Sequence, residues 1–107
     1  MKWYQTLYYG DGKSRTYKKR VQQIKNQEIL PDTWIIALAQ TESDLLEYYP
    51  SWQLLMPWMQ DADPKIVGIA LGEPEAIEII QHILEDVWAA AGDLQVKKYF
   101  KQERFSG

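Results

Sequence analysis

Cysteine is absent from this chain of 107 residues. Its absence excludes disulfide bonds, metal sites built on thiolate ligands and enzymes that use a thiol nucleophile. A chain without cysteine suits a reducing compartment, and we therefore expect a cytoplasmic protein.

Long hydrophobic runs are absent as well. The longest one, residues 34–39, is far shorter than the ~20 residues that cross a membrane as a helix. Residues 1–6 carry one lysine but no sustained apolar segment follows, so they are a poor signal peptide. We therefore expect a soluble protein that has no membrane as a partner.

Signatures of catalysis and of cofactor binding are also lacking. His82 is the only histidine, and Glu78, Glu85 and Asp86 fall at helical spacings from it. That face lies opposite the apolar stripe of the same helix, so these groups are expected to be in water. The glycine patterns that hold phosphate groups do not occur. We expect no catalytic residue, no cofactor and no metal ion, and nothing in the sequence supports enzyme activity.

What is present indicates one folded domain over residues 1–107. Hydrophobic residues make up 46% of the chain, and five tryptophans and seven tyrosines supply large side chains for a core or an interface. A chain of this length has room for a single core. Residues 101–107 are expected to form a loose tail.

Charged residues are sorted by position. Residues 13–27 contain six lysines and arginines and no acid, whereas residues 28–96 contain thirteen acids and one lysine. Residues 97–107 are basic again. Such segregation favours a contact between unlike surfaces, within one molecule, between copies or with a charged partner.

Two apolar runs predict the strands of the fold. Residues 34–39 and 66–71 are apolar without alternation, which is typical of strands covered on both faces. Residues 74–91 predict a helix, because Pro74 suits its first position and Gly92 its end. Its wide apolar stripe is expected to cover the sheet and contains Ala76, Ile77, Ile80, Ile83, Leu84, Val87, Trp88 and Ala91.

Two further segments have helical spacing. The basic segment predicts a helix that ends before Pro31, because its apolar positions share one face: Tyr17, Val21, Ile24 and Glu28. Residues 41–44 resemble an N-cap region, and the leucines and tyrosines of residues 45–49 favour a short helix that leads to Pro50. The connection between the two apolar runs is expected to be a right-handed helical crossover between parallel strands.

The predicted fold class is therefore α/β, with a small sheet of two to four strands covered by about three helices. Residues 3–9 fit either a strand or a helical turn, and residues 94–100 fit either a closing strand or a capped helical turn. If both are strands, the order becomes βαββαβ and the alternative is an α+β ferredoxin-like sandwich.

An aromatic stretch between two prolines, residues 52–59, is the strongest candidate for an interface. Tryptophan and methionine combine large contact area with adaptability, which protein interfaces favour. The predicted partner-binding residues are Trp52, Leu55, Trp58 and Met59. The leading hypothesis is thus a non-enzymatic protein-interaction module that binds a protein partner or self-associates through aromatic and complementary charged surfaces.

The basic helix supports an alternative, a nucleic-acid-binding accessory protein. Such contacts to a phosphate backbone would be weak in sequence discrimination and strongly dependent on salt. The predicted basic patch consists of Arg15, Lys18, Lys19, Arg20 and Lys25, and the later residues Lys97, Lys98, Lys101 and Arg104 extend it if the two segments lie together. A third hypothesis, a small-molecule binder or enzyme, requires dispersed acids to meet: Asp32, Glu42, Asp61 and Asp63.

The chain resembles a group of short proteins of anaerobic Firmicutes that has no assigned activity. The resemblance rests on residues 7–10, the basic helix, the two apolar runs, residues 75–78 of the long helix, and the residues Gly92, Asp93, Tyr99 and Phe100. It implies one bacterial domain of this length and assigns no functional residue.

Overall fold

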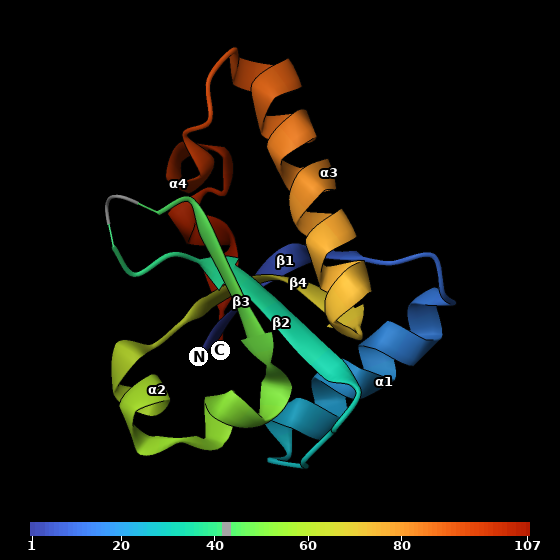
Figure 1. The fold of residues 1–107 in the computed structure, drawn as a ribbon. Helices are drawn as coiled ribbons and strands as arrows, with labels where there is room; N and C mark the ends of the chain where they lie inside the picture. Colours follow the sequence, from blue (N-terminus) through green and yellow to red (C-terminus); the bar gives the residue numbers. More distant parts are fainter. Residues whose placement is uncertain (42–43) are drawn as a thin grey trace.

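The structure is a computed structural model that describes residues 1–41 and 44–107 (Figure 1). The elements follow the order β1 (Lys2–Tyr9), α1 (Ser14–Lys25), β2 (Thr33–Leu38), β3 (Leu46–Pro50), the 3-10 turn η1 (Ser51–Leu55), α2 (Pro57–Ala62), β4 (Lys65–Leu71), α3 (Glu73–Ala91), α4 (Val96–Tyr99), the 3-10 turn η2 (Gln102–Arg104) and β5 (Phe105–Ser106).

The described residues form one five-stranded mixed sheet in the order β3-β2-β4-β1-β5. β1 runs parallel to β4, whereas β2 is antiparallel to both β4 and β3, and β5 is antiparallel to β1. The two apolar strands β2 and β4 therefore lie side by side, with Ile35 opposite Ile69. Their central position explains why neither strand alternates with polar residues.

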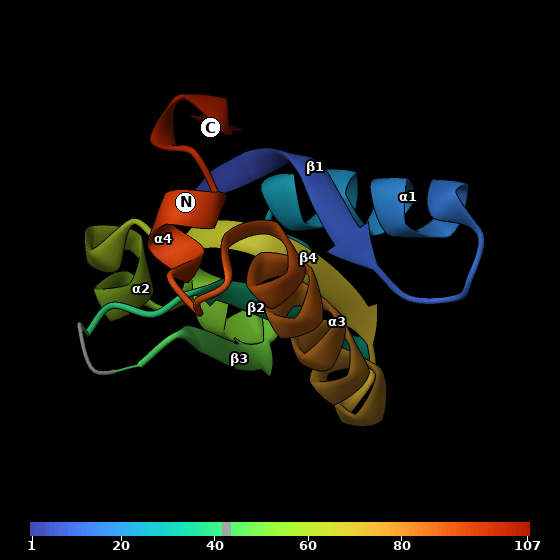
Figure 2. The ribbon, with the colours of Figure 1, turned by 90° about the horizontal axis from the view of Figure 1, so that it is seen from above.

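Helices cover both faces of this sheet. On one face, α1, η1 and α2 contribute Tyr17, Ile24, Leu54 and Met59 to a core cluster. On the other face, α3 and α4 contribute a second cluster that includes Ile83 and other residues spaced along α3. Figure 2, viewed from above, shows α1 and α3 on opposite sides of the strands. The basic helix and the acidic helix are therefore separated by the sheet.

This architecture confirms the α/β class and corrects the strand count, because the sheet has five strands rather than two to four. Residues 3–9 belong to strand β1, whereas residues 94–100 contain the short helix α4. The ferredoxin-like alternative is therefore wrong: it required a strand at residues 94–100, and its helices would share one face.

The segment after β2 differs most from the sequence-based expectation. Residues 46–50 form strand β3, which pairs antiparallel with β2 from Trp34–Pro50 to Leu38–Leu46, instead of the short helix expected there. Because β2 and β4 are antiparallel, no right-handed helical crossover joins them. The expected N-cap includes residues 42–43, which lie outside the described residues.

Residues 101–107 differ from the loose tail expected there. Two of them, Phe105 and Ser106, form β5 and pair with Tyr4 and Trp3 of β1. The two ends of the chain consequently lie next to each other (Figure 1). A search of the described residues finds no helix with the length and apolar character needed to traverse a bilayer.

Candidate functional site

Helix α3 carries two neighbouring apolar stripes: one is buried against the sheet, and the other is only partly covered. Ala76, Ile79, Ile83 and Val87 are buried in the second core cluster. The neighbouring stripe leaves Ile77 50% and Trp88 59% exposed, with Ile80 and Leu84 partly buried between them. We call Ile77, Ile80, Leu84 and Trp88 the outer stripe. The expectation that the whole wide stripe covers the sheet is therefore corrected, because Ile77, Trp88 and Ala91 are exposed.

Aromatic residues of the adjacent strands extend this apolar surface. The ring centroids of Trp34 in β2 and Tyr48 in β3 lie 5.7 Å apart, and Tyr48 is 39% exposed. Trp34 packs against the same core cluster as Ile80 and Leu84 of the outer stripe. α3 also packs against β2 and β3, on the side of the sheet opposite α1 (Figure 2).

The charged residues of α3 beside the outer stripe are acidic. Gln81 and Glu85 border the depression formed by the stripe, and Glu78 is exposed one turn earlier on the helix. α3 contains no lysine or arginine. An apolar strip with an acidic rim repels anions and favours an apolar partner.

The residues predicted for partner binding in the aromatic stretch do not share one environment. Trp58 at the start of α2 is 61% exposed and Trp52 in η1 is 41% exposed, whereas Leu55 is half-buried. Met59 is 8% exposed and belongs to the core cluster beneath α1. The stretch thus presents separate tryptophans on the α1 side of the sheet, with its methionine turned into the core.

The predicted basic patch lies along α1 and is mostly unpaired. Arg15, Lys18, Lys19 and Lys25 are exposed, and none of them forms an ion pair with another described residue. Arg20 is the exception, because its Nη1 lies 2.8 Å from Oδ1 of Asp32. These cations therefore remain available to a ligand.

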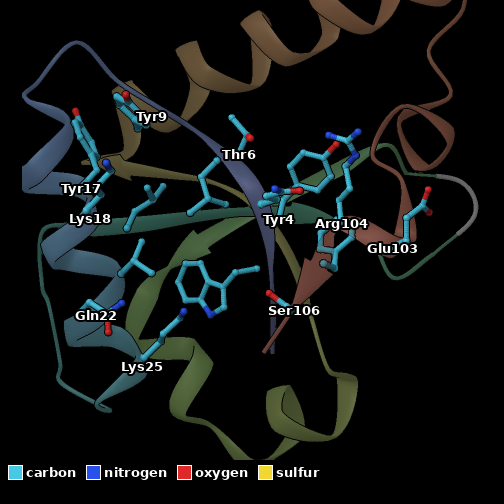
Figure 3. A pocket seen from close by; sticks show the side chains of 16 residues that line it. Tyr4, Thr6, Tyr9, Tyr17, Lys18, Gln22, Lys25, Glu103, Arg104 and Ser106 are labelled. Atoms are coloured by element: carbon cyan, nitrogen blue, oxygen red, sulfur yellow. The ribbon is translucent and has the colours of Figure 1, made fainter.

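A groove separates part of this patch from the C-terminal end of the chain. Lys18, Val21, Gln22 and Lys25 of α1 form one wall, and residues of β1, η2 and β5 form most of the rest (Figure 3). Arg104 lines the side opposite the lysines. The groove has a volume of about 830 Å³, and we call it the β1 groove. Of the basic C-terminal residues, Arg104 is therefore the one that extends the patch into this groove.

Two tyrosine–carboxylate pairs tie the ends of α3 to the rest of the fold. Tyr8 donates a 2.6 Å hydrogen bond to Asp86, and Tyr17 donates a 2.7 Å bond to Oε1 of Glu75. Glu75 also accepts a bond from the Leu71 amide, and a side chain at Gly10 would overlap its carboxyl group. Burial, followed by these hydrogen bonds, raises the pKa of both tyrosine hydroxyls above the ordinary value. Both pairs therefore act as structural ties with neutral phenols.

The described acidic residues do not gather into a metal-binding cluster. Across residues 1–41 and 44–107, no three histidine, aspartate or glutamate side chains meet in a way that could hold a metal ion. His82 is exposed. Of the acids in the small-molecule hypothesis, Asp32 pairs with Arg20, Asp63 pairs with the Met1 amino group, and Glu42 lies outside the described residues.

Sequence reasoning missed the outer stripe as a surface and the β1 groove as a site. The apolar residues of α3 are evident in the sequence. The sequence does not show which of them stay exposed, because a helix buries only one face against a sheet. The groove depends on where β1 and β5 lie in the sheet, for which the sequence carries no local signal.

Comparison with protein-family models, with curated proteins and with solved structures finds no match to this chain.

Proposed function

We propose that this chain is a non-enzymatic protein-interaction module that self-associates through the outer face of α3. The observation that supports this function is the outer stripe, in which Ile77 and Trp88 are both at least half exposed. Exposed apolar residues that lie at helical spacing along one strip are a common sign of a protein interface. Trp88 is its expected anchor, because tryptophan is among the residues most enriched at the hot spots of interfaces.

Symmetry, rather than charge, favours contact between identical faces. The basic helix α1 and the acidic helix α3 lie on opposite faces of the sheet, so a contact between α1 of one copy and α3 of another is head-to-tail. Head-to-tail contacts close only as rings and otherwise grow into filaments. Two copies that pack α3 against α3 form a closed dimer.

The size of a stable interface indicates that more than α3 takes part. Standard interfaces bury roughly 800 Å² on each partner. The outer stripe runs for only about 16 Å along its helix, so the adjacent aromatic residues Trp34 and Tyr48 are expected to contribute. Glu78 and Glu85 would lie at the rim, where water and salt screen their repulsion.

Light scattering coupled to size-exclusion chromatography, repeated over a range of protein concentrations, tests this proposal. The wild type is expected to pass from monomer to dimer as concentration rises. Trp88→Ala should raise the dimer dissociation constant by at least about tenfold, because it removes the anchor. Circular dichroism should show an unchanged fold, since Trp88 is largely exposed.

Trp58→Ala is the matched control, because Trp58 is as exposed as Trp88 but lies on the α1 side of the sheet. It should leave the monomer–dimer equilibrium unchanged. A dimer that is sensitive to Trp58 or Trp52 and insensitive to Trp88 would place the interface in the aromatic stretch. A wild type that stays monomeric at all concentrations would refute self-association.

A further inference from the structure

The outer edge of β1 is open over most of its length. β5 pairs only with Trp3 and Tyr4, and no other described strand adjoins that edge. Residues 5–9 therefore have an outer side that no described strand covers. On their inner side, Tyr8 and Tyr9 pair with β4, and the register of β1 is irregular between Trp3 and Tyr8. Open edges of this kind accept an added strand, because the main chain of an extended peptide can complete the ladder.

Both sides of this edge are hollowed, and they differ in chemistry. On the α1 side lies the β1 groove, whose apolar floor includes Leu7 and Val21, both packed partly buried against the core. On the α4 side a smaller pocket of about 250 Å³ is lined by Tyr4, Tyr8 and Tyr99, among others. Successive side chains of an added strand would point alternately into these two spaces.

The rim of the β1 groove is positively charged. Lys18 and Lys25 extend from α1 on one side, and Arg104 lies on the other side, with Glu103 as the one acid in the lining (Figure 3). None of these three cations forms an ion pair with a described residue. Lys25 lies 5.8 Å from the centre of the Trp3 ring, which places its ammonium group at the groove.

From this geometry we infer that β1 binds an extended acidic peptide of a partner protein by strand addition. Alternate residues of the peptide are acidic and face the lysines of α1, while the residues between them are apolar and face the tyrosines on the α4 side. The backbone of the peptide pairs with residues 5–9. This site is separate from the outer stripe of α3 and does not depend on self-association.

The same charges oppose pairing of this edge with a copy of itself. Two β1 strands placed edge to edge would bring two α1 helices, each without any acid, toward one another. Like charges near an open edge oppose such pairing, and lysines protect sheet edges in this way. The same lysines would attract a negatively charged strand.

Amide chemical shifts of isotope-labelled protein test the inference with a synthetic peptide of alternating glutamate and valine. The shifts of residues 5–9 and of Lys18 and Lys25 are expected to move in a saturable way. A block peptide that contains the same glutamates followed by the same valines should bind at least about tenfold more weakly, because it cannot satisfy both faces. A peptide with N-methylated amides should also lose binding.

Charge reversal gives a matched pair of variants on one helix. The double variant Lys18→Glu with Lys25→Glu is expected to weaken binding of the alternating peptide by about tenfold or more. The double variant Arg15→Glu with Lys19→Glu changes the net charge equally, but neither residue lines the groove. It should retain most of the affinity, and both proteins should keep the wild-type circular dichroism spectrum.

Several results would overturn strand addition. Equal affinity for the alternating, block and N-methylated peptides would reduce the site to non-specific charge attraction. Binding of an oligothymidylate in preference to the peptide would assign the groove to single-stranded nucleic acid, the alternative suggested by the basic helix. The absence of any shift with the alternating peptide at low salt would also reject the proposal.

Discussion

Tyr49 brings a hydroxyl group into the core without a hydrogen-bond partner among the described residues. The residue is 7% exposed and packs in the cluster beneath α1. Burial, with a smaller effect of Glu47, raises the pKa of this phenol, which therefore stays neutral. An unsatisfied polar group of this kind costs free energy that a phenylalanine would not.

Tyr49→Phe is therefore expected to increase the free energy of unfolding by about 1 kcal/mol, measured by urea denaturation. Tyr48→Phe is the matched control, because Tyr48 is the neighbour in the same strand and its side chain is exposed. It should change stability by less than about 0.5 kcal/mol. A clear loss of stability in Tyr49→Phe would mean that a buried water satisfies the hydroxyl.

At the scale of one element, α3 shows how local signals delimit a helix. Gly72 precedes it with φ of 94°, Pro74 lies in its first turn, and Gly92 ends it in the left-handed region with φ of 71°. The Gly92 amide donates a 2.8 Å hydrogen bond to the carbonyl of Trp88. Glycine is the residue most favoured at a position with this left-handed backbone geometry, and asparagine is the next most favoured.

Gly92→Ala is expected to lower the free energy of unfolding by about 1 kcal/mol, because a side chain with a Cβ is strained at this φ. No atom lies within 4 Å of the added Cβ, so steric overlap does not contribute. Gly92→Asn should cost less, since asparagine tolerates the left-handed region. Thermal unfolding of both variants checks the order, and equal losses would contradict a conformational origin.

Some of these elements could be predicted from the sequence, and others could not. The strands around Ile35 and Ile69 and the helix between Pro74 and Gly92 follow from local composition, and the structure confirms them. β3 was predicted as a helix, because Leu46 and Tyr49 also lie at helical spacing. Its strand structure comes from pairing with β2, which is a tertiary interaction.

The candidate sites, too, were only partly predictable from the sequence. The unpaired cations of α1, such as Lys18 and Lys25, were predicted from charge sorting, and the structure places them at a groove. The outward direction of Trp88 was not predictable, because the helix has more apolar residues than it can bury. Met59 was proposed for partner binding, but burial turned it inward, which periodicity does not reveal.

At the scale of the whole molecule, the sheet separates the two proposed contacts, and salt should affect them in opposite ways. Binding of the acidic peptide is driven in part by Lys18 and Lys25, so it should weaken as salt rises from about 0.05 to 0.5 M. Dimerisation through the outer stripe should stay constant or strengthen, because its rim carries Glu78 and Glu85. Titrations of peptide affinity and of the dimer at several salt concentrations check this prediction.

Because the sheet separates the two proposed contacts, each contact is expected to form without the other. Trp88→Ala should bind the peptide as the wild type does, and Lys18→Glu should dimerise as the wild type does. Loss of both contacts in either variant would show that the faces are coupled through the sheet.

The parallel pairing of β1 with β4 also has a consequence for the order in which the chain folds. During synthesis β1 is made first, but more than half of the chain separates Trp3 from its partner Ile66. The hairpin of β2 and β3 can form earlier, since its strands are neighbours in the chain. A nascent chain must therefore keep Trp3 and the rest of its first strand unpaired while the middle of the sheet is being made. Aggregation at this stage, rather than loss of the finished fold, is then the main hazard of substitutions that make β1 more apolar.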